Sequence, residues 1–70
     1  MERVKVESSS ISEIGYNEVN QILEVKFPRG SIYEYYKVPH KLVFEFMFAE
    51  SKGKYFHKNI QNVYKFKKVG

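Results

Sequence analysis

Apolar and polar side chains alternate along the middle of the chain, and this pattern predicts β-strands. In residues 22–27 apolar positions alternate with Glu24 and Lys26, as in a strand with one buried and one solvated face. Residues 31–38 are rich in Ile and Tyr, which favour strands. Residues 28–30 read Pro-Arg-Gly, and Pro and Gly favour a tight turn. Together these segments predict a β-hairpin.

A third strand is expected before this hairpin, over residues 9–16. Its apolar points, Ile11 and Ile14, are three residues apart, which breaks strict alternation and indicates a bulge or an early strand end. Gly15 tolerates the backbone angles of the bend that would follow. Three strands joined by short turns predict an antiparallel meander.

The pattern changes after Pro39, which cannot donate to a strand ladder and suits the entry to a helix. Residues 40–51 carry an apolar stripe at helical spacing, made of Leu42, Val43, Phe46 and Met47. Phe44 and Phe48 form a second stripe on another side. A helix that is apolar on two sides is either nearly enclosed by its own domain or presents an apolar patch to a partner.

A second helix is predicted over residues 55–66, after Gly53 has ended or redirected the first. Its apolar side consists of Phe56, Ile60, Val63 and Tyr64. The predicted fold class is therefore α+β: a three-stranded antiparallel meander followed by two helices packed on one face, in the order β-β-β-α-α.

The length of 70 residues indicates one domain, residues 1–70. Six Phe and six Tyr supply the apolar area for a core, because each aromatic ring can bury a large surface. There is no cysteine, so neither a disulfide nor a zinc-thiolate site supports the fold. The longest apolar-rich stretch, residues 42–49, is too short to span a membrane, and the charged N-terminus is unlike a signal peptide. We therefore expect a cytoplasmic protein with no membrane partner.

Charge is distributed unevenly along the chain, whose net charge is +4. Residues 1–50 hold six bases and eight acids, a balance of −2. Residues 51–70 hold six lysines and no acid, a balance of +6. Such asymmetry indicates contact with nucleic acid or another anionic surface. The alternative is a solvated basic end that keeps a small domain soluble.

No pattern in the chain indicates catalysis. The two histidines, His40 and His57, lie outside any metalloprotease or nucleophile motif, and no phosphate-binding glycine pattern is present. Aspartate, on which Mg²⁺ and Ca²⁺ sites depend most, is absent from the chain. We therefore expect no catalytic residue, no metal site and no cofactor. The function should rest on binding.

Tyr33 and Tyr35 share one face of their predicted strand. Two aromatic rings on a sheet face can stack nucleic-acid bases, or they can pack under a helix as part of the core. Ile32, Glu34 and Tyr36 share the other face, and the alternation does not decide which face is covered.

The basic end interleaves lysines with aromatic residues, as surfaces that bind single-stranded nucleic acid do. His57, between Lys54 and Lys58, would stack on a base or contact a phosphate. The alternative is an amphipathic helix with its rings inward and with the lysines and His57 exposed. The candidate nucleic-acid contacts are Arg29, Tyr33, Tyr35, Lys52, Lys54, His57, Lys58, Lys65, Lys67 and Lys68.

Several short stretches become specific when their order and spacing are taken together. They are Ser8-Ser9, Ile14-Gly15-Tyr16-Asn17, Leu23 with Val25 and Phe27, Gly30, Tyr33-Glu34-Tyr35, Val38-Pro39, Ala49 with Ser51 and Gly53, Tyr55-Phe56, Ile60 and Tyr64. From about residue 4 to residue 68 the chain resembles the KTSC domain. This family occurs at the C-terminus of some lysyl-tRNA synthetases and as small stand-alone bacterial or phage proteins. The resemblance implies an RNA-binding role. His57 departs from the family pattern, which often has Asn there, so a role carried by that residue would be altered.

Two functions therefore follow as expectations. The first is a small non-catalytic module that binds RNA or another nucleic acid through a basic C-terminal helix. The second is a protein-interaction or self-association module that uses the aromatic face of the first helix, with Phe44, Phe46 and Phe48.

Overall fold

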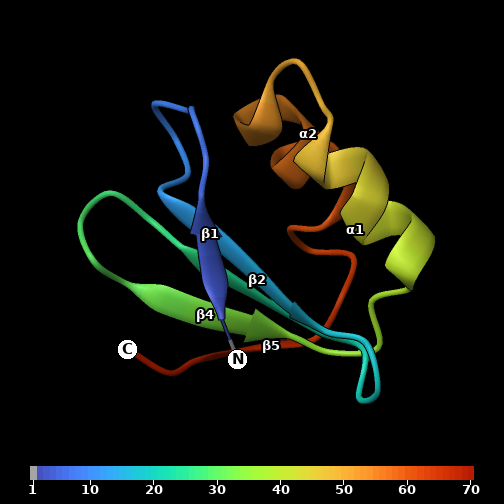
Figure 1. Ribbon diagram of the computed structural model, residues 1–70. Coiled ribbons are helices and arrows are strands. Elements are labelled where there is room, and N and C mark those ends of the chain that lie inside the picture. The colour runs from blue at the N-terminus through green and yellow to red at the C-terminus, as the bar shows by residue number, and fades with distance from the viewer. Residues whose placement is uncertain (1) are drawn as a thin grey trace.

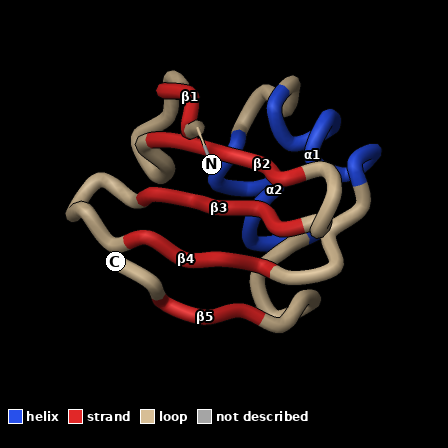
Figure 2. The backbone as a smooth tube through the Cα atoms, turned by 60° about the horizontal axis from the view of Figure 1, so that its bottom comes forward, coloured by secondary structure: helices blue, strands red, loops and turns tan. Residues whose placement is uncertain are grey.

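The computed structural model describes residues 2–70, which form five strands and two helices. In chain order these are β1 (Arg3–Lys5), β2 (Glu13–Asn17), β3 (Ile22–Lys26), β4 (Ile32–Tyr35), α1 (His40–Met47), α2 (Lys52–Asn59) and β5 (Phe66–Lys68). The five strands make one antiparallel sheet in the order β1-β2-β3-β4-β5, which Figure 2 shows from its open side. Both helices cover the same face of that sheet (Figure 1).

The predicted meander is confirmed as β2, β3 and β4, but its first strand is displaced: β2 begins at Glu13, where an early strand end was expected, and Gly15 is paired inside it and does not form a bend. The sheet is also wider than predicted. Alternation in the sequence misses β1 and β5 because each has only three residues, too few to show a period. Pairing along β2 and along β4 defines these two edge strands. The element order is therefore β-β-β-β-α-α-β, which corrects the predicted β-β-β-α-α.

Both helices are shorter than predicted, and the second is displaced toward the N-terminus. α1 ends at Met47. α2 begins after Ser51, whose hydroxyl accepts a hydrogen bond from the backbone N–H of Lys54 at 3.3 Å and so caps the helix. It ends at Asn59, and the left-handed φ of 65° at Asn62 prevents the helix from continuing to residue 66. Within residues 2–70, neither helix has the length and apolar content to cross a bilayer.

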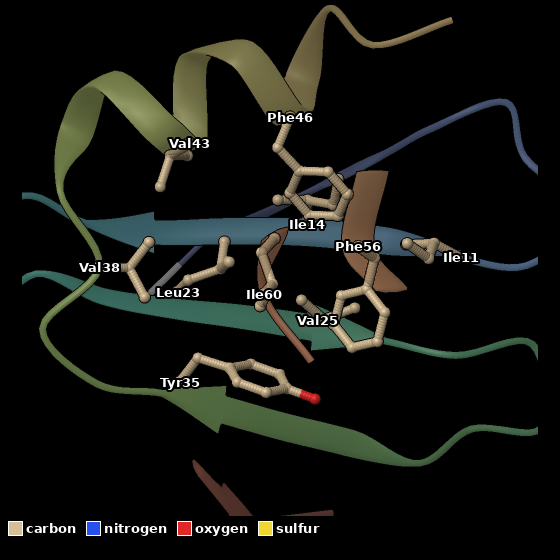
Figure 3. Packing of buried hydrophobic residues seen from close by; sticks show 10 residues of the cluster. All are labelled: Ile11, Ile14, Leu23, Val25, Tyr35, Val38, Val43, Phe46, Phe56 and Ile60. Carbon is tan, nitrogen blue, oxygen red and sulfur yellow. The ribbon is translucent and has the colours of Figure 1, made fainter. Parts of the chain in front are cut away.

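The core lies between the two helices and the sheet (Figure 3). It consists of Ile11, Ile14, Leu23, Val25, Tyr35, Val38, Val43, Phe46, Phe56 and Ile60. Register places Tyr35 opposite Leu23 and Tyr33 opposite Val25, so both tyrosines lie on the covered face. The core interpretation of this pair is therefore confirmed for Tyr35, which is 4% exposed. Tyr33 packs against the same core but is only partly buried.

Tyr55 links the two helices. Its hydroxyl donates a hydrogen bond to Glu45 Oε1 at 2.9 Å, and its ring is stacked on Phe46 with centroids 5.7 Å apart. Burial raises the pKa of Tyr55 to about 12, and the hydrogen bond to the Glu45 carboxylate adds to this rise.

The open face of the sheet carries a row of residues in cross-strand register: Arg3, Gly15, Glu24, Glu34 and Lys67. Arg3 donates from Nε to Glu13 Oε1 at 2.9 Å and from Nη1 to Glu24. The hydrogen bond from Arg3 lowers the pKa of Glu13. Gly15 lies between Arg3 and Glu24 in this row, and its lack of a side chain lets β1 pack closely on β2. A Cβ atom at Gly15 would lie 2.7 Å from the carbonyl oxygen of Glu2.

Candidate functional site

A groove lies between α2 and the strands β4 and β5, on the face of the sheet that the helices cover. Four parts of the chain line it: the segment before β2, the β3–β4 turn, β4 itself, and the stretch from α2 to β5. Its volume is about 670 Å³. Pockets for small molecules span about 300–1,000 Å³. The groove is therefore large enough for a ligand.

Five aromatic rings line this groove and contact one another in a closed circuit. In order around the circuit they are Phe27, Tyr33, Phe66, Tyr35 and Phe56. Neighbouring ring centroids lie 5.5 to 5.8 Å apart, a distance typical of packed aromatic pairs. We call this set the aromatic circuit.

The members of the aromatic circuit differ in exposure. Tyr35 and Phe56 are each 4% exposed and belong to the core. Phe27 and Tyr33 are partly buried. Phe66 is 54% exposed, although β5 places it directly opposite Tyr35. Burial also raises the pKa of Tyr35 to about 12.

Polar groups surround the rings. Arg29 lies in the β3–β4 turn, where Gly30 adopts a left-handed φ of 98°. His57 projects from α2, and its Nδ1 forms a hydrogen bond with Gln61 Oε1. Asn62, with its left-handed backbone, lines the groove beside them. No residue that lines the groove is acidic.

Of the ten candidate contacts predicted from the sequence, the groove brings together Arg29, Tyr33, Tyr35 and His57. The six lysines do not line it. Lys54 and Lys58 lie exposed on α2. Lys52 lies at the start of α2, where its Nζ donates to the carbonyl oxygen of Ala49 at 3.3 Å.

Of the remaining three lysines, Lys65 does not lie on the second helix as predicted, because that helix ends at Asn59, and Lys67 and Lys68 belong to β5. Lys65 lies between the helix and β5, in a shallow hollow beside Tyr36. Lys68 pairs with Tyr33 and so lies on the groove side of the sheet. Lys67 pairs with Glu34 and lies on the open side. The salt bridges found within residues 2–70 involve Arg3, Lys26 and His40, and none of the six lysines.

Among the groove residues that the sequence interpretation misses are Phe27, Gln61, Asn62 and Phe66. Phe27 was assigned to the core side of its strand, and Gln61, Asn62 and Phe66 fell inside the predicted helix. The Gln-Asn pair is a signal that could have ended that helix earlier, since Asn tolerates a left-handed backbone. Nothing in the local sequence indicates that Phe66 returns to the sheet.

Comparison with known proteins agrees with this architecture. A model of the family described as the KTSC domain matches residues 7–64. The chain belongs to the KTSC domain family. A crystal structure of a KTSC domain protein from Yersinia pestis matches with a TM-score of 0.93 and 38% identity, covering 99% of this chain and 97% of that one.

Relatives by sequence fall into two kinds. A lysine–tRNA ligase of Trichormus variabilis is 42% identical over 66 residues, which cover 94% of this chain and 12% of the ligase. A protein of Stutzerimonas stutzeri is 42% identical over 57 residues, which cover 81% of this chain and 80% of that protein. This KTSC chain therefore spans only about 12% of the length of the ligases it matches.

Residues that carried the resemblance to KTSC domains have evident packing roles. Ser8 Oγ accepts hydrogen bonds from the backbone N–H groups of Ser10 and Ile11 and shapes the loop before β2. Tyr16 donates from its hydroxyl to the carbonyl oxygen of Val38 at 2.5 Å. Ser51 caps α2. The motif thus builds the scaffold that holds the groove.

Proposed function

We propose that this KTSC domain is a non-catalytic module that binds RNA, with its lysines at the phosphates and the groove beside them. The observation that carries the proposal is the groove itself: aromatic rings without a neighbouring acid, next to a 20-residue segment with six lysines and no acid. Rings for bases and cations for phosphates are the two elements of single-strand recognition.

The arrangement of the acids supports this proposal. Glu13 and Glu24 are bonded to Arg3 on the open face, and Glu45 accepts from Tyr55. These carboxylates therefore have partners away from the groove. The exposed cations of α2 and of the groove side of β5 retain their attraction for phosphate.

The relatives favour RNA over other polyanions. Three of the matching proteins are lysine–tRNA ligases. Enzymes of that name act on tRNA, which makes tRNA the first RNA to test.

The test is an anisotropy titration of labelled tRNA and of a mixed-sequence single-stranded RNA at about 50 and 200 mM salt, between which phosphate-driven binding weakens sharply. We expect saturable binding at the lower salt that K54E/K58E abolishes. K58E should weaken binding more than K41E, a matched reversal of an exposed lysine on α1. Absence of binding at the lower salt would contradict the proposal.

A second candidate function is protein interaction through α1. Phe44 and Phe48 are 58% and 75% exposed, and their ring centroids lie 4.8 Å apart. This pair is turned away from the core that Val43 and Phe46 enter. If α1 mediates self-association, F44S/F48S should remain folded and sediment as a smaller species. Unchanged sedimentation would remove self-association as a role of this pair.

A further inference from the structure

The chemistry of the groove narrows the class of ligand that it suits. Its lining combines the aromatic circuit with the guanidinium of Arg29, the imidazole of His57 and the amides of Gln61 and Asn62. Because no acid lines it, a cationic aromatic ligand would lack a counter-charge there. An anionic aromatic ligand would find both a ring to stack on and a cation, and a nucleotide has this combination.

The exposure of the rings sets how a base could enter. Tyr35 and Phe56 are enclosed in the core, which leaves the half-exposed Phe66 and the partly buried Tyr33 and Phe27 as stacking surfaces. The centroids of Phe66 and Tyr33 are 5.8 Å apart and their ring planes are inclined by 51°, so a base stacked on the face of Phe66 would meet the ring of Tyr33 at an angle.

Base pairing decides which nucleotides can use such a surface. In a duplex each base is stacked on both sides by its neighbours, whereas an unpaired base can be splayed out and stacked on a protein ring. Amide side chains such as those of Gln61 and Asn62 can bond the base edge that pairing would otherwise occupy.

We propose that the groove seats one unpaired nucleotide, with its base against Phe66 and Tyr33 and its phosphate at Arg29. This rests on the proposed RNA-binding function and specifies what the groove adds to the lysines: selection of unpaired over duplex RNA. The lysines attract any polyanion, because phosphate contacts carry no sequence or pairing information.

The test compares variants of the ring that is most exposed. F66L keeps an apolar side chain on β5 but removes the aromatic face, and F66W keeps the face. F48L is the matched control, since Phe48 is exposed but lies at the C-terminal cap of α1. R29A removes the cation from the β3–β4 turn without touching β5. Each is titrated with a labelled single-stranded RNA, with the blunt duplex formed by its complement, and with single-stranded DNA of the same sequence.

We expect the single strand to bind more tightly than the duplex. F66L should weaken single-strand binding by about 5- to 150-fold, the effect of losing one stacked base, while F48L and F66W keep it. R29A, whose fold does not depend on β5, should also weaken it. Adding adenosine monophosphate should shift the ring-proton NMR signals of Phe66 and Tyr33. Equal binding of DNA would support the same proposal and show that the 2′-hydroxyl is not read.

Equal affinity for single strand and duplex, with F66L and R29A both indistinguishable from F48L, would overturn the nucleotide site. If K54E/K58E still abolished binding in that case, the proposed RNA-binding function would stand without it. Absence of binding to any of the nucleic acids would overturn both.

Discussion

Gly53, in the first turn of α2, lies directly against Ser10 in the loop before β2. A Cβ atom at Gly53 would be 2.8 Å from Ser10 Oγ and 2.9 Å from Ser10 Cβ. Real Cβ atoms essentially never come this close to another heavy atom. The contact therefore sets how near the second helix lies to the loop that closes one end of the groove.

This contact predicts the effect of G53A. In an open helix position Ala would stabilise the protein by about 0.5–1 kcal/mol relative to Gly. Here we expect destabilisation by about 1–3 kcal/mol, the usual range for overpacking. Urea unfolding followed by circular dichroism measures it. In an S10G background the obstructing atoms are gone, so G53A should become neutral or stabilising; the same loss in both backgrounds would show that Ser10 is not the cause.

Gly15 makes a second prediction, about β1. Its hypothetical Cβ meets the Glu2 carbonyl oxygen at 2.7 Å, a backbone atom that cannot rotate away. We expect G15A to release β1 from β2 and to lose the hydrogen bonds from Arg3. Amide hydrogen exchange should then be fast in β1 while β3 and β4 stay protected. G30A is the control: it carries backbone strain from its φ of 98° but has no atom within 4 Å, so β1 should stay protected.

The tyrosines predict how stability depends on alkaline pH. Burial raises the pKa of Tyr35 and of Tyr55 to about 12, above the ordinary value of 10.0. The folded state therefore holds these protons more tightly than the unfolded state does. This stabilisation is complete below about pH 10 and is lost as the pH rises through about 12. The free energy of unfolding should fall over that interval.

Ultraviolet titration of the phenolates checks this prediction directly. Burial also raises the pKa of Tyr16 and of Tyr36, so four of the six tyrosines should ionise above the ordinary pH, with Tyr35 and Tyr55 last. Y35F and Y55F should each remove one of these last steps. Y55F also deletes the hydrogen bond to Glu45 and should cost about 0.5–1.5 kcal/mol of stability. Ionisation of all six tyrosines at one pH near 10 would contradict the assignment.

Lys67 and Lys68 provide an internal comparison for the RNA-binding proposal. They are adjacent in sequence, yet Lys68 lies on the groove side opposite Tyr33 and Lys67 lies on the open side opposite Glu34. Both reversals change the net charge equally. K68E should weaken RNA binding several-fold more than K67E in the anisotropy titration, because only Lys68 lies on the side of the groove. Equal losses would mean that net charge, and not this surface, attracts the RNA.

The central hairpin could be predicted from the sequence because its information is local. Alternation in residues 22–27 and 31–38 indicates strands and their faces, and Pro28 with Gly30 marks the turn. The first helix and its buried Phe46 follow from helical spacing in the same way. Periodicity was sufficient in these elements because each is long enough to show it.

The candidate site could be predicted only in part. One groove is lined by four of the predicted contacts: Arg29, Tyr33, Tyr35 and His57. The sequence indicated these residues by their chemical type, and it did not show that they lie close together. The six lysines looked like one basic end, whereas the end of α2 at Asn59 divides them between a helix, a loop and two faces of a strand. The chain leaves the helix at Ile60, and the left-handed backbone of Asn62 keeps the following residues out of it.

The sequence by itself therefore determined the α+β class, the central strands, the aromatic core and the family to which the chain belongs. Tertiary structure decided the two edge strands, the covering of Tyr33 and Tyr35, and the aromatic circuit that Phe66 completes. The physical reason is that the first group depends on periods within a segment. The second depends on pairing between residues far apart in the chain, such as Tyr35 with Phe66, which no local pattern encodes.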